Sequence, residues 1–230
     1  MDTEEFRRHG HALIDWLADY RETLASRPVQ PPTRPGDVRA MLPAAPPEHA
    51  EPFEACIADL DTVVAPNLTH WQHPRFFGYF PANALLAGVL GDLVSTGLGT
   101  IGLSWQSGPA LTEVEEVVTD WVRQMVGLSA GWVGVISDTA STSTLVALIS
   151  ARERTTGYSL ARGGLHGEPA PLVVYASAGS HSCVAKGALL AGIGRDHIRT
   201  VPLDAGQGMV PEALDAMIEA DLAAGLRPCA

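Results

Sequence analysis

Short β-prone runs alternate with helical segments through the second half of the chain, and this alternation limits the fold more than any other feature. Strand-like runs occupy residues 132–136, 172–176 and 198–201, and residues 228–230 resemble the beginning of a further strand. Successive parallel strands need a crossover that is long enough to hold a helix. We therefore predict an α/β fold, with a mainly parallel sheet and helices on both faces. The helices of this part are expected at 142–154, 182–191 and 211–224, with a surface loop at 155–171.

The first 70 or so residues have a different pattern. Apolar side chains recur at helical spacing over residues 3–26, which predicts an amphipathic helix. Seven prolines lie between residues 28 and 47, so this stretch is expected to form an extended arm. A second helix is predicted at about 51–68. Because these elements cannot bury their own apolar faces, they should dock on the rest of the chain or on a second copy.

Two further helices are predicted between these regions. The stretch 82–98 is apolar and rich in small residues, which indicates a buried helix. Thr112 and Glu115 have the spacing of a capping box, shortly after Pro109. The second of these helices is therefore expected to start there and to end near Gly127.

The charge balance argues against one broad class of function. The formal net charge is −11 and basic residues form no cluster, so a nucleic-acid-binding protein is not expected.

Glycine and aspartate interrupt the longest apolar stretch, residues 82–103, so we expect no membrane span. The three cysteines are distant from one another, which indicates neither a disulfide framework nor a zinc site. Without a secretory signal after Met1, a cytoplasmic location is expected.

A turn rich in hydroxyl groups joins the run 132–136 to the helix at 142–154. This hydroxyl turn, residues 137–144, holds Ser137, Thr139, Ser141, Thr142, Ser143 and Thr144. A helix N-terminus offers free N–H groups and the positive end of the helix dipole, so the turn suits a phosphate. No glycine–lysine pair of a nucleotide P-loop is nearby. The alternative is a set of helix caps with surface serines.

His181 follows the strand 172–176 and directly precedes the helix 182–191. Ligands bind at the carboxyl ends of the strands in open parallel sheets, and a neutral imidazole there can stack on an aromatic ligand. The alternative is a histidine that caps or packs against the helix. His70 and His73 are close in sequence, but no set of carboxylates or cysteines joins them, so we predict no metal site.

Residues 71–80, WQHPRFFGYF, form an aromatic segment. Aromatic side chains at this density either line an apolar pocket or belong to the core. Tyr79 has a hydroxyl group that needs a polar partner if it is buried, so it is the first candidate for a polar role.

Several separated motifs, taken together, resemble one family. HPRFFGYFP at 73–81 resembles the signature of the group II pyridoxal-phosphate (PLP) decarboxylases, in particular the aromatic-L-amino-acid decarboxylases. The similarity continues through IGLSW at 101–105, GVISDTAS at 134–141 and residues 178–188. The resemblance implies the large α/β domain of a fold-type I PLP-dependent transferase, preceded by an N-terminal helical extension. It also implies decarboxylation of an aromatic L-amino acid, such as tryptophan, DOPA, tyrosine or phenylalanine, to the amine and CO2.

The same resemblance implies roles for individual residues. Thr139, Ala140 and Ser141 would hold the phosphate of the cofactor, and His181 would stack on its pyridine ring as the catalytic histidine. The substrate pocket would be lined by Trp71, Tyr79, Phe80, Ala82, Ile101 and Leu103. Leu103 stands where animal members of the family have phenylalanine, and Ala82 where they have threonine. These two changes leave the choice of amino acid open.

The resemblance also implies that the chain is roughly the N-terminal half of such an enzyme. The Schiff-base lysine, the aspartate that pairs with the pyridine nitrogen and a mobile loop are all expected after Ala230. Lys186, the only lysine, does not match the family's lysine and is expected to be a surface or structural lysine. Residues 1–80 would form a dimerisation segment and residues 81–230 the first part of the PLP-binding domain. The expected partners are a second copy and the C-terminal half, and the 230 residues alone should be inactive.

Two alternatives remain open from the sequence. The substrate could be another amino acid, such as histidine or glutamate. An acidic substrate would favour an arginine in the pocket, and Arg75 is the only arginine of the aromatic segment. The chain could instead be a truncated, non-catalytic homologue that acts as an interaction or regulatory protein. The sequence also does not distinguish simple decarboxylation to the amine from decarboxylation coupled to oxidative deamination.

Overall fold

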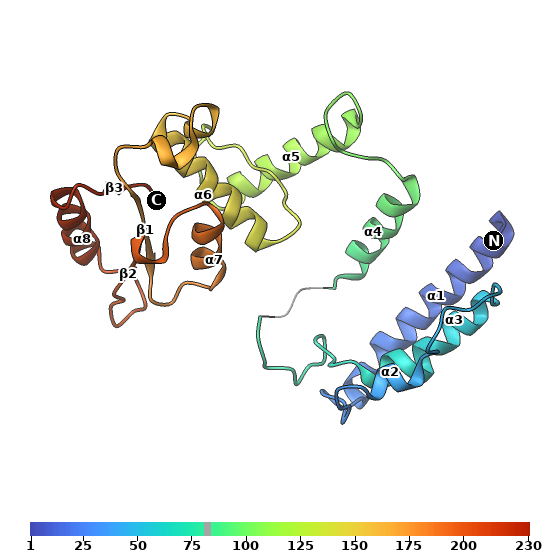
Figure 1. Ribbon diagram of the computed structural model, residues 1–230. Coiled ribbons are helices and arrows are strands. Elements are labelled where there is room, and N and C mark those ends of the chain that lie inside the picture. The colour runs from blue at the N-terminus through green and yellow to red at the C-terminus, as the bar shows by residue number, and fades with distance from the viewer. Residues whose placement is uncertain (81–83) are drawn as a thin grey trace. The chain divides into compact units, whose positions relative to one another are not determined.

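The computed structural model describes residues 1–80 and 84–230, which form two units, Met1–Thr100 and Ile101–Ala230 (Figure 1). The first is helical, and the second contains the sheet.

The first unit begins with a long helix. Helix α1, Thr3–Thr23, starts with a capping box in which the Asp2 side chain accepts from the Glu5 N–H and the Glu5 side chain accepts from the Asp2 N–H. A 3-10 turn, Leu24–Ser26, continues α1. The helix predicted at 3–26 is therefore confirmed.

The remaining helices of the first unit are shorter. Helix α2 spans Asp37–Met41, α3 spans Phe53–Asp59, and α4 spans Leu86–Leu98. The chain continues α3 through a π-helical turn, Leu60–Val64, and a 3-10 turn, Ala65–Asn67, so the helix predicted at about 51–68 is also confirmed. Helix α2 was not predicted, because the prolines around it indicated an extended arm throughout. It starts directly after Gly36, whose φ of 101° is readily adopted by glycine.

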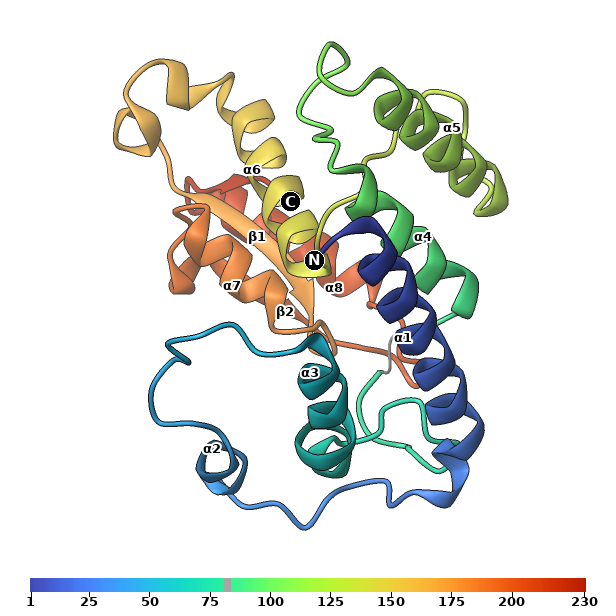
Figure 2. The same ribbon diagram turned by 90° about the vertical axis from the view of Figure 1, so that its right-hand side faces the viewer.

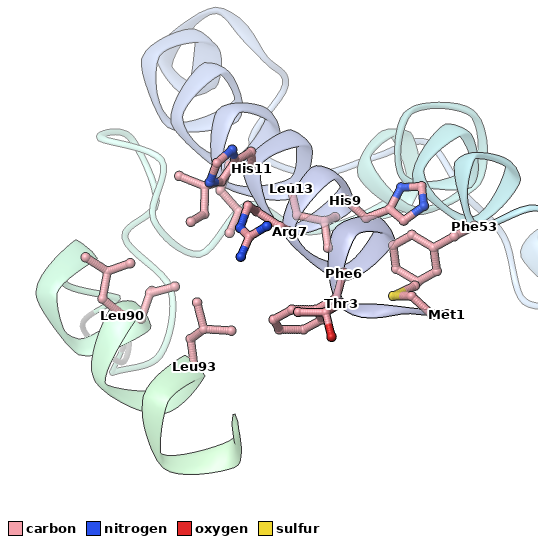
Figure 3. Close-up of a pocket in the computed structure, with 14 residues that line it drawn as sticks. Met1, Thr3, Phe6, Arg7, His9, His11, Leu13, Phe53, Leu90 and Leu93 are labelled. Carbon is pink, nitrogen blue, oxygen red and sulfur yellow. The ribbon is translucent and has the colours of Figure 1, made fainter. Parts of the chain in front are cut away.

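An apolar groove runs between α1 and α4 in the first unit. Its volume is about 540 Å³, and Phe53 of α3 lies at one end (Figure 3). Figure 3 shows Leu90 and Leu93 of α4 pointing toward α1. Helix α4 was predicted to be buried, but none of its residues in the described structure is buried, and Leu98 is 70% exposed. That prediction was wrong because the hydropathy of a segment indicates that its apolar side chains favour burial, but it does not identify the surface that buries them.

A parallel sheet organises the second unit. Strand β1 spans Leu172–Ser177, β2 spans Ile198–Val201 and β3 spans Arg227–Pro228, in the order β2-β1-β3. Val174 pairs with Ile198 on one side of β1, and Leu172 pairs with Arg227 on the other. Both pairings are parallel, as the alternation of strands and helices predicted.

Four helices belong to the second unit. They are α5, Pro109–Met125; α6, Ala140–Thr156; α7, Cys183–Leu190; and α8, Pro211–Ala223. Helices α6 and α7 lie on one face of the sheet and α8 on the other, as the two views agree (Figures 1 and 2). Leu172 and Val174 face Leu148 of α6 and Ala188 of α7 in the core, whereas the Tyr175 hydroxyl reaches α8. The predicted α/β architecture is therefore present, with 3-10 turns at Ser159–Ala161, Gly164–Gly167 and Arg195–His197.

Two predictions for the second unit were wrong. Residues 132–136 are not a strand; they are extended and exposed, and the Ile136 N–H donates to Glu115 Oε1 at 2.8 Å. A strand needs a neighbouring strand, and no described strand pairs with this run. The second error concerns α5, which begins at Pro109, so Thr112 lies inside the helix and donates to the Gly108 carbonyl. Thr112 and Glu115 therefore form no capping box.

Candidate cofactor-binding site

The hydroxyl turn forms the N-terminus of α6. Thr139 is the N-cap residue, and its Oγ1 accepts a hydrogen bond from the Thr142 N–H at 3.2 Å. The first intrahelical bond runs from the Ser143 N–H to the Thr139 carbonyl, so the N–H groups of Ala140 and Ser141 precede the helical ladder. These two donors lie at the positive end of the α6 dipole.

Some of the hydroxyl groups are used within α6 itself. Ser143 Oγ donates to the Thr139 carbonyl at 3.2 Å, and Thr144 Oγ1 donates to the Ala140 carbonyl at 2.8 Å. The capping interpretation is therefore confirmed for Thr139, whereas the phosphate interpretation stays a prediction. The groups that suit an anion are the N–H groups of Ala140 and Ser141 and the exposed Ser141 side chain.

Close packing of α6 and α7 brings His181's loop near this turn. A Cβ atom at Gly187 of α7 would lie 3.0 Å from Leu148 Cδ1 and 3.6 Å from Leu145 Cα, so a larger side chain would crowd this approach. Cys183 Sγ lies 3.6 Å from Thr144 Oγ1. A cavity of about 240 Å³ lies between the two helices and is lined by Ser141, Thr142, Leu145, Cys183, Lys186, Gly187 and Leu190.

His181 lies in the loop between β1 and α7. Its Nδ1 accepts a hydrogen bond from the Cys183 N–H at 3.2 Å, which is the capping role considered above. Because a backbone N–H can only donate, this contact requires an unprotonated Nδ1 and leaves the proton of the neutral ring on Nε2. His181 is exposed, so capping at Nδ1 leaves the ring accessible for stacking.

The loop that carries His181 is fixed at its start. The Ala178 N–H donates to the Val201 carbonyl of β2 at 3.1 Å, and the Ser180 N–H donates to the Ser177 carbonyl at 3.0 Å. Lys186 is exposed on α7, as predicted. The second unit therefore places the hydroxyl turn and His181 at the ends of two helices that pack together.

The aromatic segment belongs to the first unit. The Trp71 ring stacks on Phe76, with centroids 5.2 Å apart, and on Tyr79, with centroids 5.4 Å apart. Phe80 is 97% exposed and Tyr79 is 88% exposed, so these two side chains are not part of the core of this unit. Tyr79 also has a φ of 53°, a left-handed conformation that non-glycine residues rarely adopt.

Three further residues, Ala82, Ile101 and Leu103, were predicted to line the substrate pocket. Ala82 lies outside the described residues. Ile101 and Leu103 are 71% and 84% exposed at the start of the second unit, in the loop before α5. The structure thus brings Trp71 and Tyr79 together, and it brings the hydroxyl turn close to the His181 loop.

The sequence interpretation gave Glu115 a capping role and missed its contact with Ile136. Its bond to the Ile136 N–H ties α5 to the run that leads into the hydroxyl turn. The partners are 21 residues apart, and no local pattern indicates such a bond.

The described residues also bear on two other kinds of site. No group of three or more histidine, cysteine, aspartate or glutamate side chains in them is arranged to bind a metal ion. Among the described helices, none combines the length and hydropathy of a membrane span.

Comparisons with known proteins agree with this architecture. Residues 35–230 match the family model of the pyridoxal-dependent decarboxylase conserved domain. The chain is 37% identical to the phenylacetaldehyde synthase of Arabidopsis thaliana, over 99% of this chain and 47% of that protein. It is 38% identical to the aromatic-L-amino-acid decarboxylase of Bos taurus, over 99% of this chain and 48% of that protein.

Solved structures are similar over the whole chain. The structure of Oryza sativa TDC with PLP and tryptamine superposes with a TM-score of 0.92 at 34% identity, covering 100% of this chain and 48% of that one. Catharanthus roseus tryptophan decarboxylase in complex with L-tryptophan superposes with a TM-score of 0.90 at 35% identity, covering 99% of this chain and 50% of that one. The chain spans about half the length of the curated relatives it matches, and it corresponds to their N-terminal part. On this evidence the chain belongs to the group II PLP-dependent decarboxylases, within the aromatic amino acid decarboxylase family.

Proposed function

We propose that the chain is the N-terminal part of an enzyme that decarboxylates an aromatic L-amino acid to the amine and CO2. One observation carries the proposal: unbonded helix donors at Ala140 and Ser141 occur on a helix that packs against the one capped by an exposed histidine, His181. A phosphate and an attached aromatic ring need these two kinds of group close to each other. The family membership supports the same assignment.

The donor set of the hydroxyl turn fits the phosphate of PLP. The N–H groups of Ala140 and Ser141 and the Ser141 hydroxyl would bind phosphate oxygens, while Thr139 holds the helix start in place through Thr142. When bound, PLP supplies an electron sink for the charge that is left as CO2 departs.

His181 would orient the pyridine ring. Its Nδ1 accepts from the Cys183 N–H, and this bond restrains the imidazole before any ligand binds. A fixed ring at this position would hold the cofactor flat and restrict the substrate to one face.

The aromatic segment would favour an aromatic substrate. Trp71, Tyr79 and Phe80 present apolar rings, and Ile101 and Leu103 add exposed aliphatic groups. These five side chains, with Ala82, are the proposed lining of the substrate pocket. Relatives named for tyrosine and tryptophan decarboxylation are consistent with this substrate class.

The proposed enzyme is a homodimer that also requires the C-terminal half of its chain. The exposed apolar residues of α1 and α4 are suited to cover by a second copy. We expect no decarboxylase activity from the 230 residues alone. We also propose a cytoplasmic location, since all three cysteines are free and a reducing compartment keeps them so.

The test is cofactor binding by the complete polypeptide. Ser141→Ala and His181→Ala should each weaken PLP binding by about tenfold or more, because each loses a direct contact to the ligand. Ser150→Ala, on an exposed position of the same helix, is the matched control and should bind as the wild type does. Binding is measured by absorbance titration.

Two results would contradict the proposal. One is a complete polypeptide that takes up no PLP, and the other is wild-type affinity in both site variants. Turnover of tryptophan, DOPA, tyrosine, histidine and glutamate by the intact protein then identifies the substrate. Predominant activity on histidine or glutamate would overturn the aromatic assignment while leaving the cofactor site intact.

A further inference from the structure

Two buried histidines lie at the start of the aromatic segment, and the proposed function does not use them. His70 and His73 are each 3% exposed. They face α1 and the 3-10 turn after it, and they belong to no metal-binding cluster of the described residues. One ring contact of each histidine joins this part of the chain to α1 or to the turn that follows it.

His73 has hydrogen bonds at both ring nitrogens. Its Nδ1 accepts from the Arg75 N–H at 2.9 Å, and its Nε2 lies 3.3 Å from the Ala25 carbonyl oxygen. A backbone N–H cannot accept a proton, so Nδ1 must remain unprotonated, and Nε2–H donates to Ala25. The contact with Arg75 is therefore possible only for a neutral imidazole.

His70 is joined to α1 through Tyr20. Tyr20 Oη lies 2.8 Å from His70 Nδ1, and the His70 backbone N–H donates to the Val29 carbonyl at 2.9 Å. Tyr20 is itself held in place: its ring stacks on Trp16, with centroids 5.5 Å apart, and the Arg27 guanidinium carbon lies 5.1 Å from its centroid.

Burial and nearby positive charge oppose protonation of His70. Burial, with the nearby Arg27 and His73, lowers the pKa of His70 below its ordinary value. Burial raises the pKa of Tyr20, while Arg27 and Arg21 act in the opposite direction. The Asp61 carboxylate accepts from the indole N–H of Trp16, the residue that stacks on Tyr20, at 2.9 Å.

We propose that His70 and His73 are positioning residues whose hold on the end of α1 is strongest while both imidazoles are neutral. A charged His73 cannot accept from the Arg75 N–H, and a charged His70 would be buried near Arg27. The segment's importance for substrate binding rests on the proposed function, but its attachment to α1 does not. Because the pKa of His70 is lowered in the folded chain, its neutral form contributes fully above pH about 6.5, the ordinary value for histidine. As the pH falls below that value, protonation is favoured in the released segment, so the attachment weakens.

Amide hydrogen exchange of the complete polypeptide, read by mass spectrometry over residues 69–80, tests the proposal. From about pH 8 to about pH 5.5, exchange of this peptide, corrected for the intrinsic pH effect, should become about tenfold faster, the order expected for one buried hydrogen bond. His73→Asn retains a side-chain oxygen that can accept from the Arg75 N–H but does not titrate. This variant should show a much smaller pH effect. His49→Asn removes an exposed histidine and should behave as the wild type does.

Tyr20→Phe provides a milder change if the histidine variants fail to fold. It removes only the hydroxyl that contacts His70, and exchange at 69–73 should become several-fold faster at both pH values. Wild-type protection that is equal at the two pH values overturns the proposal, as does a full pH effect in His73→Asn. Exchange is recorded without coenzyme. A protein that binds no PLP but shows the pH effect would therefore contradict the proposed function and leave the present proposal intact.

Discussion

The Tyr175 hydroxyl and the Arg199 guanidinium both donate to the Asp221 carboxylate, and this contact fastens α8 to the two longest strands. Tyr175 Oη lies 2.8 Å from Asp221 Oδ2, and Arg199 Nε lies 3.1 Å from Oδ1. Burial, together with the bond to Asp221, raises the pKa of Tyr175 to about 12. The hydrogen bond from Arg199 lowers the pKa of Asp221, so the carboxylate is charged and accepts from both neighbours.

Tyr175→Phe should therefore destabilise the protein at neutral pH and change its alkaline behaviour. Loss of a hydrogen bond to a charged acceptor should lower the free energy of unfolding by about 1–2 kcal/mol. The neutral hydroxyl stabilises the fold fully below pH about 10, its ordinary pKa. That contribution is lost as the pH rises toward the folded value of about 12. Urea unfolding at about pH 7 and across this alkaline range should show a smaller alkaline loss in the variant than in the wild type.

Tyr158→Phe is the matched control, because Tyr158 is 70% exposed. It should leave stability at neutral pH within about 0.5 kcal/mol of the wild type. An alkaline stability curve for Tyr175→Phe that parallels the wild-type curve would show that this hydroxyl does not titrate with folding.

Single residues were predictable where their role follows from a position on one element. Thr139 and His181 were chosen because each stands between an expected strand and an expected helix, and both are helix-terminal in the structure. The contact of Tyr175 with Asp221 was not predictable. It joins residues 46 positions apart on a strand and a helix, and their distance depends on how the whole sheet packs.

At the scale of elements, helices were predicted better than strands. A helix forms its hydrogen bonds within one segment, so local sequence was enough to locate α1, α6 and α8, and α1 was located by its apolar periodicity. A strand depends on a neighbour, and the run 132–136 has the composition of a strand without a described partner. The start of α5 was misplaced because Pro109, which favours the first turn, competed with the capping pattern three residues later.

The packing of α6 on α7 gives a prediction at this scale. Gly187→Val should lower the free energy of unfolding by about 1–3 kcal/mol, because its methyl groups would meet the backbone of α6. Gly187→Ala should have a smaller effect, since alanine gains up to about 1 kcal/mol of helix propensity. That gain would offset a contact with the flexible end of Leu148. Urea unfolding of the two variants measures the difference.

Gly88→Val, on α4, provides the comparison, because an added Cβ there meets no described atom within 4 Å. Its stability should stay close to that of the wild type. If Gly187→Val unfolds at the wild-type urea concentration, the two helices have room to move apart, and the close approach is not a constraint on the site.

At the scale of the whole molecule, the exposed apolar surface is the main feature that the chain does not explain by itself. Phe6 and Ile14 of α1 are 60% and 42% exposed, and Leu90 and Leu93 of α4 are 51% and 49% exposed. All four line the groove of about 540 Å³ in the first unit (Figure 3). Relatives about twice as long have additional chain, but a helical face at the far N-terminus is also suited to a second copy.

Charge on this face should therefore weaken the proposed dimer of the complete polypeptide. Phe6→Glu combined with Ile14→Glu should raise the dissociation constant about a hundredfold, because two apolar side chains of about 1.5 kcal/mol each lose their burial. Sedimentation velocity over a range of concentrations measures the change, and circular dichroism checks that the helices remain. His49→Glu adds a charge at an exposed position outside the helices and should leave the dimer unchanged. A folded double variant that dimerises with wild-type affinity would exclude this face of α1 from the interface and direct the search to the exposed apolar residues of α5.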